Sequence, residues 1–187
     1  MLPEVVSCAI EPAHILNPIR HLCTNITFHQ ATIEKIDIEL QKVALVETNS
    51  RCPRELPYDH LIINLGLMMN LSAVPGMAEH ALPLKTLRDA FHLRNHVLSR
   101  LEETNSEPRV DIRKTILTFV NIGGGFSGVE TIAAVNDMVK AVLPLYPRAQ
   151  ETGAQMILVH SRQGILNELD PELTEFSTKK LRERGVQ

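Results

Sequence analysis

The sequence predicts an α/β protein, and three observations support this fold class. A β-branched, apolar run over Thr115–Ile122 is followed at once by the glycine-rich segment Gly123–Gly128 and then by apolar residues at helical spacing. A second short strand is predicted over Gln155–His160. Upstream, short runs within Ile26–Thr48 alternate apolar and polar residues, as in a small antiparallel meander. The sequence therefore predicts a Rossmann-like β-α-β unit joined to a small β-meander.

The N-terminal part of the chain is predicted to be mainly β-structure. The runs that indicate the meander are Ile26–Phe28, Ile36–Ile38 and Val43–Val46, and Pro53 ends it. Farther along, Leu61–Gly66 is a compact apolar run closed by glycine, which is the pattern of a strand buried on both faces. We expect this run to enter the core of a sheet.

A long helix is predicted next. Thr86 and Asp89 stand at the spacing of a capping box, and apolar residues follow them at helical spacing. A helix of about four to five turns is expected there. The following segment, Glu102–Arg113, is polar and holds Pro108, so we interpret it as an exposed connection before a new structural unit.

The C-terminal part continues the alternation of strand and helix. The apolar helical face that follows the glycine-rich segment ends at Pro144. A last helix is predicted to begin with Asp170 as N-cap and Pro171 in the first helical position, and to end at Gly185. Because two strands cannot cover the faces and edges of a doubly wound sheet, a third strand is expected to begin after Gly185.

Composition and charge narrow the classes of protein. The chain is 44% hydrophobic and 22% charged, as in a globular protein, and its net charge of -3 gives no reason to expect nucleic acid as a partner. Cys8, Cys23 and Cys52 are widely spaced, so we expect free thiols in a reducing cytoplasm. His92 and His96 stand four apart on the predicted helix but lack a third ligand, so no metal site is assigned.

Chemistry is indicated by one motif of the form G-x-G-x-x-G. Its residues are Gly123, Gly124, Gly125, Phe126, Ser127 and Gly128. The motif alone is weak, but here it follows a strand and opens a helix, which is the context of a dinucleotide-binding turn. Gly123 permits the tight turn, Gly125 lets the backbone approach a pyrophosphate, and Gly128 allows close contact between helix and strand. The helix N-terminus then attracts the phosphate charge, although spacing alone leaves open a tight turn without a ligand.

The second half of the dinucleotide motif is altered. An acidic side chain normally ends the second strand and accepts hydrogen bonds from the adenosine ribose. Here His160 takes that place, and Arg162 lies just beyond it. A neutral imidazole accepts one hydrogen bond, and a protonated one attracts the 2′-phosphate of NADPH, so we expect NADH use with weakened discrimination. The alternative is that His160 merely ends the strand and Arg162 points to solvent.

Three segments give the chain a family resemblance. Gly123–Glu130 closely resembles the type II NADH:quinone oxidoreductases, which are two-dinucleotide-domain flavoproteins of the pyridine nucleotide-disulfide oxidoreductase kind. Leu56–Gly66 is similar to the family's strand that returns to the FAD-binding domain. Val74–Ala81, together with Leu84–Leu87, resembles its crossing into the NAD-binding domain.

The resemblance implies an FAD-dependent NADH dehydrogenase. Hydride would pass from NADH to FAD, and electrons would then reach a membrane quinone. Glu130 matches the family's glutamate after the third glycine, which lies near the nicotinamide and the flavin, although it could also complement the helix dipole. Residues 1–78 would be the last part of an incomplete FAD-binding domain, and residues 79–187 a partial NAD(H)-binding domain with its entry helix.

The chain also departs from the family. The family's FAD pyrophosphate turn would precede these residues, and its second FAD-contacting segment, quinone-site residues and membrane anchor would follow them. We therefore expect a partial chain that is inactive alone and lacks FAD, from a protein that lies peripherally on the cytoplasmic membrane face. Asn64 replaces the expected small or hydroxyl residue, and His160 the expected glutamate. Two alternatives stay open: a piece of a disulfide reductase-like flavoprotein, or a non-catalytic dinucleotide-binding remnant.

Overall fold

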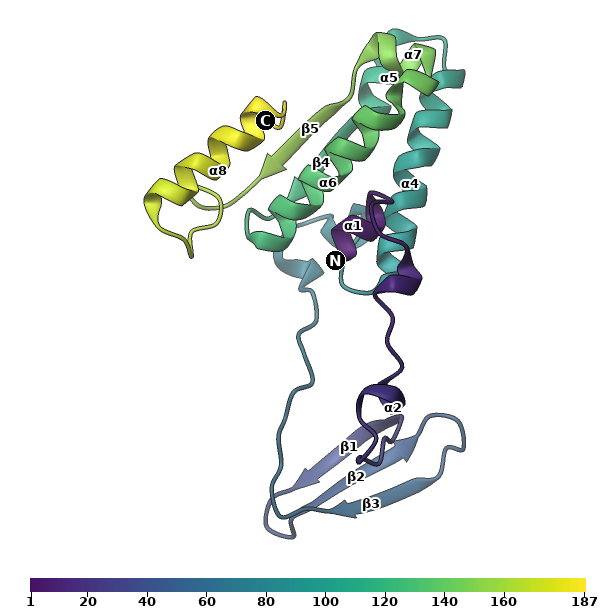
Figure 1. The fold of residues 1–187 in the computed structure, drawn as a ribbon, viewed down its shortest axis with the longest axis vertical. Helices are drawn as coiled ribbons and strands as arrows, with labels where there is room; N and C mark the ends of the chain where they lie inside the picture. The colour runs from purple at the N-terminus through teal and green to yellow at the C-terminus, as the bar shows by residue number, and fades with distance from the viewer. The chain divides into compact units, whose positions relative to one another are not determined.

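The structure, a computed structural model, describes all residues from Met1 to Gln187 and divides into two compact units (Figure 1). Unit 1 comprises Met1–Ile15 and Met69–Gln187, and unit 2 comprises Leu16–Met68. Along the chain, unit 2 is therefore an insertion into unit 1. The predicted division at residue 78 concerns which cofactor each part holds, and it stays a prediction. The compact units follow a different boundary, because the first fifteen residues pack with unit 1.

Unit 2 holds a three-stranded antiparallel sheet, as the alternating pattern predicts. Its strands are β1 (Ala31–Asp37), β2 (Lys42–Glu47) and β3 (Pro53–Pro57), in the order β1-β2-β3, and the short helix α2 (Ile19–Leu22) precedes them. The meander is confirmed, but its bounds differ from those predicted. Ile26–Phe28 forms no strand, and Pro53 begins a strand instead of ending the sheet. The first position of an edge strand is one of the few strand positions that tolerate proline.

The predicted buried strand at Leu61–Gly66 is wrong. These residues form no regular secondary structure, and their apolar side chains are exposed, with Ile62 at 91% and Leu65 at 73%. A strand that is buried on both faces needs a hydrogen-bonded neighbour and helices over the sheet. No strand of this chain pairs with the segment, so its apolar pattern has nothing to pack against.

Unit 1 contains the predicted parallel β-α-β unit. Strand β4 (Thr118–Ile122) pairs in parallel with β5 (Gln155–Val159), and α6 (Phe126–Val142) connects them and packs against both (Figure 1). After α8 (Pro171–Glu183), the backbone returns alongside β5. Val186 forms a parallel bridge with Met156, and the Gln187 N–H donates to the Met156 carbonyl at 2.9 Å. The expected start of a third strand is thus confirmed.

The predicted long helix is α4 (Leu87–Ser106), and its capping box is present. The Asp89 N–H donates to Thr86 Oγ1 at 3.2 Å, while the Thr86 N–H donates to Asp89 Oδ2 at 2.7 Å. These two bonds satisfy donors that the first turn of a helix leaves free. The helix runs farther than its apolar pattern predicts.

The predicted exposed connection over residues 102–113 is mostly exposed, but only residues 107–109 are irregular and the rest is helical. Helix α4 continues to Ser106, and α5 (Val110–Ile116) begins soon after it. Two polar side chains in this stretch are buried, because partners are available: Thr104 Oγ1 donates to the Arg100 carbonyl at 2.7 Å, and Arg113 pairs with Glu151 of α7 (Pro147–Thr152) at 3.2 Å. The polar composition of this segment therefore does not reveal its helices or its two buried side chains.

The core of unit 1 joins segments that are distant in sequence. Helix α1 (Leu2–Val6) packs against α4 and α6, and its Val5 and Val6 are fully buried. The shorter elements are η1 (Pro12–His14), η2 (Leu71–Ala73), α3 (Met77–His80) and η3 (Leu143–Leu145). None of the helices has both the length and the apolar character that a membrane crossing requires.

Candidate dinucleotide-binding site

The glycine turn joins the end of β4 to the start of α6. Gly123 has a φ of +116°, which side chains of L residues rarely adopt, so glycine is required at this position. Its N–H donates to the Val159 carbonyl of β5 at 2.9 Å, and its carbonyl accepts from Asn121 Nδ2 at 3.1 Å. The turn is thereby tied to the ends of both parallel strands.

The other two motif glycines differ in their surroundings. A Cβ atom at Gly128 would stand 1.9 Å from the Gly123 carbonyl oxygen, so the helix approaches the turn too closely for any side chain. A Cβ atom at Gly125 would meet no atom within 4 Å. Gly128 therefore serves internal packing, whereas the space beside Gly125 is open to a ligand.

Three backbone N–H groups are available at the start of α6. The first helical hydrogen bond runs from the Val129 N–H to the Gly125 carbonyl at 3.0 Å, and no side chain caps the helix. The N–H groups of Phe126, Ser127 and Gly128 consequently have no partner within the chain. Phe126 and Ser127 are exposed. Free donors at the positive end of a helix dipole suit a phosphate group.

His160 lies at the turn, as its place after the second strand predicts. Its Nδ1 atom accepts a hydrogen bond from the Gly124 N–H at 3.1 Å, and its Nε2 atom lies 3.1 Å from Asn167 Nδ2. The Leu166 N–H donates to the Gly124 carbonyl at 2.7 Å, so the loop after β5 folds onto the turn. The sequence places His160 correctly but gives no sign of this bond.

The two remaining predicted site residues, Arg162 and Glu130, take no part in the hydrogen bonds of the glycine turn. Arg162 is exposed and forms no hydrogen bond or ion pair. Glu130 is the fifth residue of α6, and it lines a cavity of about 500 Å³ with residues of α1 and with Asp137 and Arg184. Arg184 donates to Asp137 there. Beyond the first turn, Glu130 is weakly placed to complement the helix dipole.

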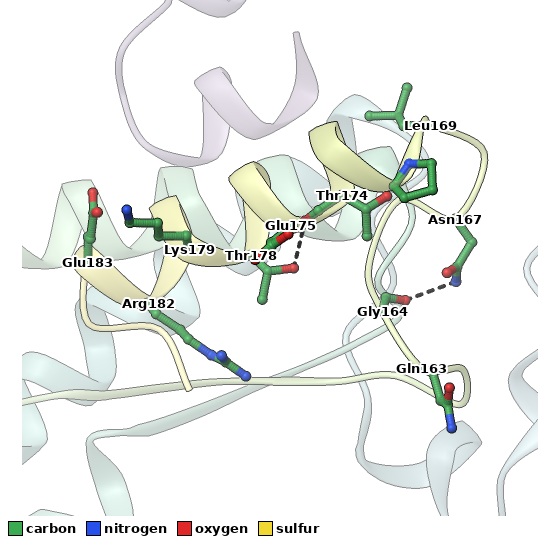
Figure 2. Close-up of a pocket in the computed structure, with 11 residues that line it drawn as sticks. Gln163, Gly164, Asn167, Leu169, Thr174, Glu175, Thr178, Lys179, Arg182 and Glu183 are labelled. Carbon is green, nitrogen blue, oxygen red and sulfur yellow. Dashed lines mark hydrogen bonds between the residues drawn. The ribbon is translucent and has the colours of Figure 1, made fainter.

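A larger cavity lies between α8 and the loop after β5 (Figure 2). Its volume is about 890 Å³, and its lining includes Asn167, Thr174, Lys179 and Arg182. Figure 2 shows the Asn167 side chain turned toward the Gly164 carbonyl, to which its Nδ2 donates at 2.9 Å. The sequence interpretation missed these residues, because charges at helical spacing are typical of a solvated helix face.

The fold and the site together define a class of protein. A parallel β-α-β unit whose glycine turn presents free amides beside open space is a dinucleotide-binding domain. Residues 1–187 match the family model described as pyridine nucleotide-disulphide oxidoreductase. The chain belongs to this family.

Individual relatives agree with this assignment. The external alternative NAD(P)H-ubiquinone oxidoreductase B4, mitochondrial, of Arabidopsis thaliana is 33% identical over 100% of this chain, which covers 33% of that protein. The external NADH-ubiquinone oxidoreductase 2, mitochondrial, of Saccharomyces cerevisiae is 29% identical over 95% of the chain, covering 34% of that protein. The chain thus spans about a third of the length of the curated relatives it matches.

A solved structure shares the fold. NDH2 from Plasmodium falciparum in complex with NADH superimposes with a TM-score of 0.86 at 21% identity. The alignment covers 100% of this chain and 39% of that one. This likeness confirms the predicted dinucleotide-binding α/β architecture.

Proposed function

We propose that the chain is part of a flavin-dependent NADH dehydrogenase that transfers hydride from NADH to FAD and then passes electrons to a quinone. The observation that carries this proposal is the row of free N–H groups at Phe126, Ser127 and Gly128, with open space beside Gly125. Relatives named as NAD(P)H-ubiquinone oxidoreductases and the solved NDH2 complex with NADH support it.

Each site residue has a distinct proposed role. The amides of Phe126, Ser127 and Gly128 bind the pyrophosphate of NADH, whose negative charge also interacts favourably with the helix dipole. Glu130 lies farther along α6, and its proposed role, which follows from the family resemblance, is to orient the nicotinamide ring for hydride transfer. FAD supplies the two-electron chemistry in the whole protein.

The setting of the whole protein is also a proposal. A quinone acceptor is a membrane component, so the whole protein works at a membrane surface, peripherally and on the cytoplasmic face. The relatives compared above are named mitochondrial and external. Fractionation of a tagged whole protein from cells, with salt washing of the membranes, would test both the compartment and the peripheral attachment.

Calorimetric titration of the purified chain with NADH and with ADP-ribose tests nucleotide binding. We expect both to bind, because both carry the pyrophosphate. Failure of both to bind a chain that circular dichroism shows to be folded would contradict the proposal. No observation of this structure favours the disulfide reductase alternative.

A further inference from the structure

The loop after β5 holds Gly124 from both sides. The Gly124 N–H donates to His160 Nδ1 at 3.1 Å, and the Gly124 carbonyl accepts from the Leu166 N–H at 2.7 Å. Gly124 is buried, so neither group has water as a substitute partner. Both polar groups of this one peptide residue are therefore satisfied by the loop.

The same loop explains why residue 124 is glycine. The G-x-G-x-x-G pattern leaves this position unrestricted. In this chain, however, a Cβ atom at Gly124 would stand 2.8 Å from His160 Cγ and 3.0 Å from Ile165 Cγ2. The extra glycine is thus required by the histidine that packs over it, and the two residues form one unit.

The loop itself is held in a constrained shape. Leu166 is buried and has a φ of +52°, a left-handed conformation that a branched residue adopts only when its surroundings fix it. Its carbonyl accepts from Thr174 Oγ1 of α8 at 3.3 Å. Asn167 closes the other side, with Nδ2 3.1 Å from His160 Nε2. Because Nδ1 accepts from the Gly124 N–H, a neutral ring carries its proton on Nε2, so the Asn167 contact is not a second hydrogen bond accepted by the ring.

We propose that His160 is a positioning residue of the phosphate-binding turn, a role that rests on the proposed binding of NADH. Because Nδ1 accepts from Gly124, the ring cannot turn toward an adenosine ribose without leaving a buried N–H unpaired. Loss of the bond would release the Gly124 N–H, two residues before the first of the free amides of Phe126, Ser127 and Gly128. His160 thus acts on the pyrophosphate through the shape of the turn.

The central experiment compares two substitutions of His160. His160→Asn keeps an acceptor near the place of Nδ1, whereas His160→Leu keeps bulk and removes the acceptor. For NADH affinity measured by calorimetry, we expect a loss of about tenfold in His160→Leu and rescue by His160→Asn to within roughly threefold. Arg88→Leu, at an exposed side chain of α4 without hydrogen-bond or ion-pair partners, is the control and leaves the affinity within roughly threefold. Equal losses in the Asn and Leu variants would overturn the proposal.

Nuclear magnetic resonance of the nucleotide-free chain measures the conformation of the turn directly, through its amide chemical shifts. We expect the amide resonances of Gly124 to Gly128 to shift in His160→Leu, and to stay in place in Arg88→Leu. Unchanged resonances in His160→Leu overturn the positioning role. If the wild-type chain binds no NADH while these shifts occur, the proposed function fails and the control of the turn by His160 stands.

If His160→Leu does not fold, a double-mutant cycle tests the packing of Gly124 against His160 instead. Gly124→Ala should lower the unfolding temperature, because its methyl group meets His160. In Gly124→Ala combined with His160→Ala, the shortest of these contacts, the one with His160 Cγ, is removed, so the combined loss should be smaller than the sum of the single losses. Simple additivity would overturn the pairing of the two residues.

Discussion

Gly128 lies directly against the carbonyl oxygen of Gly123, at a distance that leaves no room for a Cβ atom, which would stand 1.9 Å from that oxygen. Gly128→Ala should therefore push the start of α6 away from the turn and lower the unfolding temperature. A loss of about 1–3 kcal/mol is the usual order for such overpacking, or about 2–12 °C. Differential scanning calorimetry measures it.

Gly125→Ala is the matched substitution, because a Cβ atom there meets nothing within 4 Å and its φ of -78° suits any residue. We expect an unchanged unfolding temperature but NADH affinity weakened by about tenfold or more, since the methyl group occupies the approach of the pyrophosphate. A Gly125→Ala chain that binds NADH as tightly as the wild type would contradict the placement of the phosphate.

Glu130 is exposed and forms no hydrogen bond, so Glu130→Gln should leave the unfolding temperature within about 1 °C. In the whole flavoprotein we expect slower reduction of the flavin by NADH, because the carboxylate is proposed to orient the nicotinamide. Stopped-flow absorbance of the flavin measures this step. Single-turnover rates equal to those of the wild type would remove Glu130 from the reaction.

Cofactor preference is predicted to depend on the side chain at position 160. No acidic group ends β5, so nothing there repels a 2′-phosphate, and we expect the affinities for NADH and NADPH to differ by less than about tenfold. His160→Glu keeps an acceptor for the Gly124 N–H and adds a negative charge, so it should weaken NADPH selectively. Paired titrations with both nucleotides test this. Negligible NADPH affinity in the wild-type chain would be evidence against it.

The capping box of α4 should contribute measurably to stability. Thr86→Ala removes the acceptor for the Asp89 N–H, and the typical loss is about 1 kcal/mol, or 2–4 °C in unfolding temperature. Thr86→Ser, which keeps a hydroxyl acceptor, is the control. Equal unfolding temperatures for the Ala variant and the wild type would mean that packing alone fixes the helix start.

The same capping box predicts a pH dependence. Hydrogen bonds from the backbone N–H groups of Thr86 and Lys85 lower the pKa of the Asp89 carboxyl group. A lowered folded-state pKa means that the stabilisation is present at neutral pH and is lost as the pH falls through that value. As the pH falls below about 4, the wild type should therefore lose more stability than Asp89→Asn, which does not titrate. Parallel acid unfolding curves would refute this.

The sequence predicts best the elements whose formation depends only on residues close to them along the chain. The glycine turn, α6, β5 and the capping box depend on neighbouring residues, and the structure confirms each of them. The failures share a different cause. Leu61–Gly66 has the pattern of a buried strand, but a strand also needs pairing partners, and its own pattern does not supply them.

Long-range contacts account for the other misses. The polar sequence of residues 102–113 is typical of a loop. The ion pair that accompanies the burial of Arg113 involves Glu151, nearly forty positions away, so the local pattern does not reveal it. The bond between Gly124 and His160 also joins distant positions, so the motif reveals the turn but not what holds it. The proposed cofactor contacts of the glycine turn follow from residue types at fixed offsets, and they stay a prediction.

The insertion of unit 2 into unit 1 has a consequence for the order of folding during synthesis. The meander in Leu16–Met68 is contiguous, and its strands pair through short hairpins, so it can fold as soon as it leaves the ribosome. Helix α1 is made earlier but buries Val5 and Val6 against α4 and α6, whose residues emerge much later. Helix α1, which is made before unit 2, therefore waits with its apolar face uncovered, a natural binding target for chaperones on the nascent chain.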